Sequence, residues 1–197
     1  MDNYRILAEH FGRNGKVRVI VTGTEAKTDG TTIYLPENVP DAIQGVLLAT
    51  LMHESYHIRL TSFDIAAAIN KGAAHRAHIL NVLEDVRIDT LVHSDWPNAS
   101  NLYWDLMDYY VQKHGAEFDA LPWQVRVCRN FIIKSYNRRA FDRHLHRDAE
   151  VSAFETANGL KLDAIRAAAK AAPDTKALAP LVDELLALLF PADAKAE

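Results

Sequence analysis

Apolar residues recur at helical spacing along most of this chain, from residue 41 almost to the end. Spacings of three and four residues place such positions on one face of a helix. Breaks near Lys71-Gly72 and Trp96-Pro97 separate neighbouring segments. The pattern therefore predicts helices over the ranges 2–13, 41–60, 62–70, 73–93, 100–114, 122–144, 148–170 and 176–189.

Two segments near the N-terminus alternate in polarity instead. VRVIVTGT (17–24) and TTIYLPE (31–37) are rich in β-branched residues and flank the turn signal Thr28-Asp29-Gly30. They predict a β-hairpin, in which residues 31–35 would be an edge strand. The expected fold is mainly α with a small β-hairpin or sheet, that is, an α+β fold.

The length of 197 residues favours one domain, residues 1–197. Within it, residues 17–93 contain the hairpin and the helices that carry the candidate metal ligands. Residues 94–190 form a helical C-terminal half, and residues 191–197, PADAKAE, are predicted to be a disordered tail.

Charge and cysteine content narrow the function classes. The net charge of -4 argues against nucleic acid, because phosphate binding needs a basic surface. The basic stretch 137–148 is interrupted by Asp142 and Asp148, which favours a solvated helix face. The single cysteine, Cys128, and the polar N-terminus predict a cytoplasmic protein. No stretch approaches the ~18 consecutive apolar residues of a membrane span, so none is expected.

The segment LMHESYHIRL (51–60) carries the clearest candidate chemistry. His53 and His57 lie four residues apart, so a helix turns both imidazoles to one side, where they can bind one zinc ion. Glu54 is displaced by ~100°, off the metal but near a water that it can deprotonate. A random sequence of this length and composition would contain the pattern roughly 0.02 times, so coincidence is a weak explanation.

A catalytic zinc needs a third protein ligand, and the helix at 73–93 offers two neighbouring carboxylates. Glu84 falls in an apolar stripe between Leu80 and Ile88, where a carboxylate needs a cation. Either zinc or Arg87 can supply that charge. If Glu84 binds zinc, Arg87 can also orient the Glu84 carboxylate from the second shell. Asp85 is the alternative ligand, on a polar flank predicted to be solvated that also carries Asn81, His78 and Asp89. Asp89 can support a ligand histidine through its other ring nitrogen.

HESYH followed by NVLEDVRID resembles gluzincin-type zinc metallopeptidases. More narrowly, the chain is similar to the metallopeptidase-like domain of cobaltochelatase T-type subunits and related bacterial and phage proteins associated with von Willebrand A domains. The stretch TDGTTIYLPE also fits that resemblance, which covers roughly residues 17–93. It implies a zincin-like domain with one Zn²⁺ held by His53, His57 and Glu84. Ile88 stands where thermolysin-like relatives have a supporting aspartate, and no Asp-x-Ser-x-Ser sequence is present.

The expected function is zinc-dependent hydrolysis of a peptide or protein substrate, with Glu54 as general base. Strand 31–35 would hold the substrate backbone by edge pairing. Tyr103, Tyr136 and His93 are candidate donors to the oxyanion. The alternative is an inactive zincin-like adaptor domain with a structural zinc, acting with an ATPase or a phage assembly partner. A fourth protein ligand, such as His78 or His93, would favour the adaptor.

Overall fold

The computed structural model describes residues 2–13, 15, 17–24, 26–37, 44–136 and 139–193. Mainly helical structure with a small three-stranded sheet confirms the expected α+β class at that level. The chain divides into two compact units: unit 1 comprises Met1–Thr61 and Leu91–Lys113, and unit 2 comprises Ser62–Thr90 and His114–Glu197. Within the described residues, no helix is both long and apolar enough to cross a membrane.

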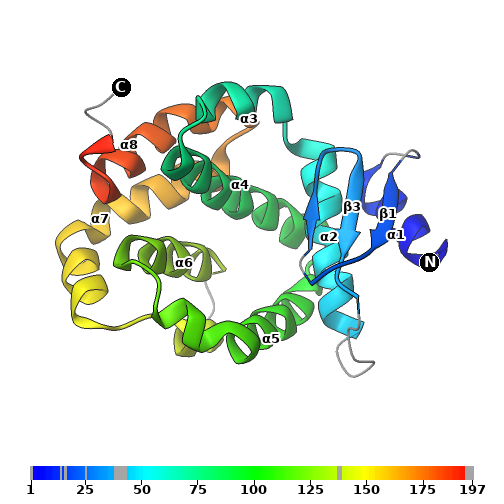
Figure 1. Cartoon of the computed structure of the whole chain (residues 1–197), viewed down its shortest axis with the longest axis horizontal. Helices are drawn as coiled ribbons and strands as arrows, with labels where there is room; N and C mark the ends of the chain where they lie inside the picture. The colour runs from blue at the N-terminus through cyan, green and yellow to red at the C-terminus, as the bar shows by residue number, and fades with distance from the viewer. Residues whose placement is uncertain are drawn as a thin grey trace. The chain divides into compact units, whose positions relative to one another are not determined.

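Most of the predicted helices are present with end shifts of one to three residues, whereas α5 continues to Asp119, beyond its predicted end at 114. Unit 1 contains α1 (Asp2–Gly12), β1 (Arg18–Val21), β2 (Lys27–Thr28), β3 (Thr32–Leu35) and α2 (Gln44–Leu60) (Figure 1). Helices α4 (Ala74–Asp95) and α5 (Ala99–Asp119) contribute residues to both units. Unit 2 further contains α3 (Phe63–Asn70), α6 (Trp123–Ser135), η2 (Arg139–His144), α7 (Ala149–Ala171), η3 (Lys176–Leu178) and α8 (Ala179–Leu189).

Some predicted boundaries fall differently or outside the described residues. The start of the helix predicted at 41–60 includes residues 41–43, which lie outside them. The helix predicted at 122–144 is two elements, because α6 ends at Ser135 and a 3₁₀ turn, η2, follows. In the basic stretch 137–148, residues 137–138 also lie outside. Of the predicted disordered tail, residues 194–197 lie outside, and residues 191–193 form a short turn.

The hairpin predicted from residues 17–24 and 31–37 is wrong. β1 pairs with β3 in parallel, and the antiparallel partner of β3 is the two-residue strand β2. The strand order is therefore β1-β3-β2 (Figure 1), with β3 in the centre. Because β3 is paired on both sides, the edge-strand role expected for residues 31–35 is wrong as well. The physical reason is that the chain changes direction between β1 and β2 and again at the Asp29 turn between β2 and β3, so β1 and β3 run the same way.

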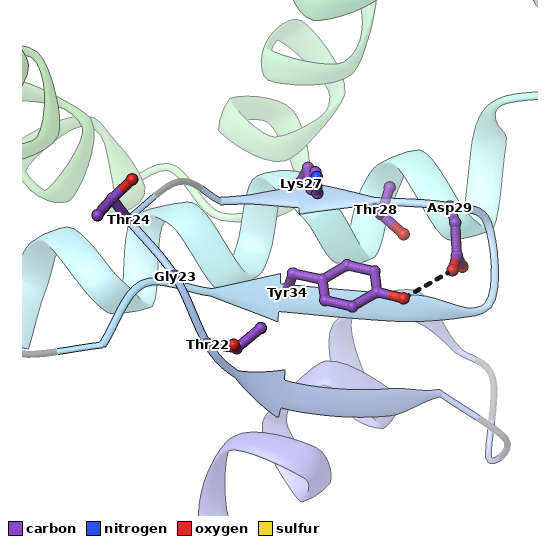
Figure 2. Close-up of a pocket in the computed structure, with 7 residues that line it drawn as sticks. All are labelled: Thr22, Gly23, Thr24, Lys27, Thr28, Asp29 and Tyr34. Carbon is purple, nitrogen blue, oxygen red and sulfur yellow. Dashed lines mark hydrogen bonds between the residues drawn. The ribbon is translucent and has the colours of Figure 1, made fainter.

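Asp29 fixes the turn that joins β2 to β3. Its Oδ1 accepts hydrogen bonds from the backbone N–H groups of Thr31 and Thr32, at 3.0 and 2.8 Å. The Tyr34 hydroxyl donates to Oδ2 at 3.2 Å, and Figure 2 shows the ring lying along β3 toward that carboxylate. Gly30 supplies the positive φ of 92° that the turn requires. These backbone donors, which bind the ionised carboxylate, hold the pKa of Asp29 at about 2.

Helices α1 and α2 pack closely against each other and against the sheet. A Cβ added at Gly12 would lie 3.2 Å from the backbone oxygen of Ser55, so glycine permits the close approach of the two helices. One hydrophobic cluster of unit 1 combines side chains from α1, the sheet and α2; its buried members are Ala8, Val17, Ile33, Leu35 and Leu51. This packing fixes the face that α2 turns away from the sheet.

The larger core lies in unit 2. It combines the apolar stripe of α4 with α6, α7, η3 and α8, and Ile79, Leu83 and Val86 are fully buried members. Asp148 caps α7 by accepting a hydrogen bond from the Val151 N–H at 3.1 Å. The packing of Ile79, Leu83 and Val86 in this core fixes the α4 segment that carries Glu84 and Asp85.

We expect Asp29 to titrate with a pKa of about 2 in the folded protein. Since the folded pKa is lower than the ordinary value of 3.8, the contribution of Asp29 to stability is fully present above pH 3.8 and is lost as the pH falls through the folded value. Carbon-detected NMR of the Asp29 carboxyl measures this pKa directly. A midpoint at or above the ordinary value would contradict the turn geometry.

Candidate metal centre

Helix α2 aims two imidazole rings at each other. The Nε2 atoms of His53 and His57 lie 3.0 Å apart, with the ring planes inclined at 75°. Two nitrogens that each lie about 2.0–2.1 Å from a tetrahedral ion are separated by about 3.3 Å. The pair therefore has close to the spacing that a shared metal ion requires, as the four-residue separation predicts.

Thr61, just beyond the end of α2, contacts the far side of the His57 ring. Its Oγ1 lies 3.0 Å from Nδ1 of His57. When Nδ1–H donates to this oxygen, the proton stays off Nε2, whose lone pair is then available to a metal. Sequence reasoning missed Thr61, although its position four residues after His57 on a helical path was the available signal.

Asp85 of α4 joins the two histidines in one group. A carboxylate oxygen of Asp85 and one ring nitrogen each of His53 and His57 all lie within 4.8 Å of one another. Two nitrogens and one carboxylate oxygen are a donor set suited to a divalent transition metal. Among the described residues this group has three members, and neither His78 nor His93 belongs to it.

The group contains Asp85, the alternative ligand, and does not contain Glu84, which the sequence favoured. Consecutive residues on a helix point about 100° apart, so Glu84 and Asp85 cannot both point toward the two histidines. Glu84 Oε2 instead accepts hydrogen bonds from Nε and Nη2 of Arg87, at 2.8 and 2.7 Å. Both side chains are almost completely buried, with 2% and 1% of their surface exposed. The predicted ion pair is thus present.

The second oxygen of Glu84 has a different environment. Oε1 is buried and makes no hydrogen bond with any described residue. A buried carboxylate oxygen normally has a partner, because leaving it unsatisfied costs about 1–3 kcal/mol or more. This orphaned oxygen is a second acceptor for a cation, so Glu84 stays a prediction as a ligand.

Asp89 is not on a solvated flank, and that part of the prediction is wrong. Its exposed fraction is 2%, and its Oδ2 accepts a hydrogen bond from the Tyr136 hydroxyl at 2.7 Å. Burial, and then the Asp89 charge, raise the pKa of Tyr136 well above its ordinary value, so the phenol stays protonated. Asp85 and His78 are half-buried, whereas Asn81 is exposed and donates to Asp85 Oδ2 at 3.2 Å. Tyr136, the residue that follows α6, contacts Asp89 from a distant part of the chain, and a projection of α4 alone does not include it.

The remaining predicted residues lie in unit 1. Glu54 is buried on α2, with an exposed fraction of 8%. The rings of His93 and Tyr103 pack against each other with their centroids 4.9 Å apart. The oxyanion role predicted for Tyr103, Tyr136 and His93 stays a prediction; the Tyr136 hydroxyl donates to Asp89.

Comparison of the chain with protein-family models, curated proteins and solved structures gives no match. The candidate centre therefore rests on the geometry of its own residues.

Replacing Thr61 with valine removes the acceptor for His57 Nδ1–H at nearly constant shape. We expect metal affinity to fall about 10–100-fold in Thr61→Val and to be largely kept in Thr61→Ser. In the metal-free protein, long-range ¹⁵N–¹H NMR of the His57 ring should report a shift away from the Nδ1–H tautomer in Thr61→Val alone. Identical tautomer populations in wild type and Thr61→Val would contradict this role.

Replacing Glu84 with leucine leaves the buried Arg87 guanidinium without its carboxylate. We expect Glu84→Leu to lower the free energy of unfolding by about 3–5 kcal/mol, as measured by urea denaturation. The double variant Glu84→Leu/Arg87→Met, which removes both charges, should recover most of that loss. A double variant no more stable than the single one would show that the pair does not act as a unit.

Proposed function

We propose that this protein is a metal-dependent hydrolase of peptide bonds, in which His53, His57 and Asp85 bind one divalent cation and Glu54 is the general base. The observation that carries the proposal is the group of two ring nitrogens and one carboxylate oxygen within 4.8 Å, beside a buried glutamate on the same helix. The resemblance of HESYH and NVLEDVRID to gluzincin-type metallopeptidases supports the same chemistry.

The donor set narrows the choice of metal. Two imidazoles and a carboxylate with one open position are typical of catalytic zinc. The same three donors also bind non-haem iron(II). Glu54 favours zinc and hydrolysis, because a base beside the metal is needed to activate water and has no comparable role in oxygen chemistry.

The chain's own residues carry the proton transfers. A bound divalent cation would supply Lewis-acid chemistry, by polarising a carbonyl and lowering the pKa of a water molecule. Glu54 takes the proton from that water as it attacks the carbonyl carbon, and then delivers it to the leaving amine. The buried position of Glu54 limits competing solvation, and Thr61 keeps His57 in the tautomer that binds metal.

The adaptor alternative predicts a structural metal, and structural zinc is normally held by four protein ligands. The group formed by the described residues has three. A glutamate next to the ligands is also unnecessary in a purely structural site. Both points favour the enzyme over an inactive zincin-like adaptor that acts with an ATPase or a phage assembly partner.

Metal content of matched variants tests the ligand set. We expect wild-type protein purified with trace metals to contain one zinc per chain by mass spectrometry. His53→Ala and Asp85→Asn should lose it, whereas Glu54→Gln should keep it. Glu84→Gln is the matched control for Asp85→Asn, because both remove a carboxylate charge from neighbouring residues of α4. Metal loss in Glu84→Gln alone would assign the third ligand to Glu84.

A peptide library read by mass spectrometry tests the reaction. Wild-type protein should cleave members of the library, and Glu54→Gln should lose about 10²–10⁴-fold in rate while it retains metal. Cleavage that persists unchanged in Glu54→Gln, or a fully metallated wild type that cleaves nothing in the library or in a whole-proteome digest, would contradict the hydrolase proposal.

A further inference from the structure

A second hollow in unit 1 lies on a different face of α2 from the histidine pair. Its volume is about 290 Å³, and its walls come from the end of α1, from α2 and from the end of α4. Tyr56 and Arg59 line it from α2, and their face is turned roughly 110° from that of His53 and His57. The hollow is therefore separate in position from the candidate metal centre.

The floor of this hollow is a closed network of hydrogen bonds. The Tyr56 hydroxyl donates to Asp95 Oδ2 at 2.6 Å and accepts from Trp96 Nε1–H at 3.1 Å. Arg59 Nη1 donates to the same Asp95 oxygen at 3.2 Å. The Tyr56 hydrogen bond, followed by Arg59, lowers the pKa of Asp95, so the carboxylate is ionised and already neutralised by its partners. The hydrogen bonds therefore position Tyr56, Asp95 and Arg59 relative to one another.

Aromatic rings form one wall. Trp96 packs edge-on against Phe11, with the centroids 5.5 Å apart and the planes at 87°, and lies 5.8 Å from the ring of His10. Although these contacts hold the indole in place, 39% of the Trp96 side chain remains exposed. An exposed tryptophan held rigidly by its neighbours offers a flat surface to a planar group at little entropic cost.

Arginine side chains supply the charge of the rim. Arg13 lines the hollow just past α1, and its guanidinium makes no hydrogen bond with any described residue. Its backbone adopts a positive φ of 49°, which is uncommon for a residue other than glycine. Left-handed backbone of this kind commonly ends a helix, as it does here just after α1. With Arg59 also present and Asp95 neutralised, the hollow has a surplus of positive charge.

We propose that this hollow binds a small planar aromatic ligand that carries a carboxylate or phosphate group. The anion would contact Arg13 and the remaining N–H groups of Arg59, because guanidinium groups recognise both kinds of oxyanion through paired hydrogen bonds. The ring would lie against Trp96. The volume of about 290 Å³ accommodates about one ring system with its charged group. A cationic ligand is disfavoured by the two arginines.

The test is a ligand titration monitored by the indole N–H signals of ¹⁵N-labelled full-length protein, with the Trp96 signal assigned from Trp96→Phe. The probes are phenyl phosphate, benzoate, inorganic phosphate and benzylamine. We expect phenyl phosphate, benzoate or both to move the Trp96 signal saturably, at concentrations at least about 10-fold lower than inorganic phosphate. Whichever of the two binds more tightly identifies the anion. Benzylamine should have no effect.

Matched arginine variants decide whether the rim is responsible. Arg13→Gln should weaken binding of the preferred probe at least about 10-fold, since a hydrogen bond to a charged group is lost, and Arg59→Gln should weaken it as well. Arg5→Gln is the control, because Arg5 lies on α1, pairs with Glu9 on the surface and does not line the hollow. Unchanged melting temperatures would verify folding.

Three outcomes would overturn the proposal. They are no saturable shift of the Trp96 signal up to about 10 mM of any probe, equal affinity in Arg13→Gln and wild type, and tighter binding of benzylamine than of the anions. None of these measurements depends on bound metal or on hydrolysis, so the result is independent of the proposed peptidase function.

Discussion

Burial of ionisable side chains along α2 and α4 is the constraint on which the candidate site depends. Glu54, His57, Glu84, Arg87 and Asp89 all have less than a tenth of their surface exposed. Each such group costs several kcal/mol to bury unless it has a partner. The fold meets this cost with specific pairs: Thr61 for His57, Arg87 for Glu84 and Tyr136 for Asp89. Beside these pairs, one ring nitrogen each of His53 and His57 and a carboxylate oxygen of Asp85 lie within 4.8 Å of one another.

The same constraint explains why a metal ion is the reasonable occupant of the group. Two imidazole nitrogens and a carboxylate oxygen close together are all electron-pair donors, so a cation stabilises them more than any neutral partner does. The orphaned Oε1 of Glu84 adds negative potential on the neighbouring residue of α4. The proposed hydrolysis combines these donors with Glu54, which is buried on the same helix as the two histidines.

Helix α2 is shared by two different chemistries in unit 1. One face carries His53 and His57, whereas the adjoining face carries Tyr56 and Arg59 above a hydrogen-bonded floor. A helix held by close packing, as α2 is against α1 through Gly12, can position both sets of side chains without rearrangement. The sheet fixes α2 from the other direction, with β3 as its central strand.

The sequence alone determined the features that depend on local periodicity. The helices, the turn at Asp29-Gly30 and the convergence of His53 with His57 follow from spacings of four residues or fewer, which backbone geometry converts directly into position. Tertiary structure decided the features that depend on contacts between segments far apart in the sequence. It placed β3 between β1 and β2, because strand order depends on the path of the connections, and it buried Asp89 beneath Tyr136. The described group of candidate ligands also contains Asp85 and not Glu84, because consecutive residues of a helix point about 100° apart and the pattern of α4 alone does not say which one lies near the histidines.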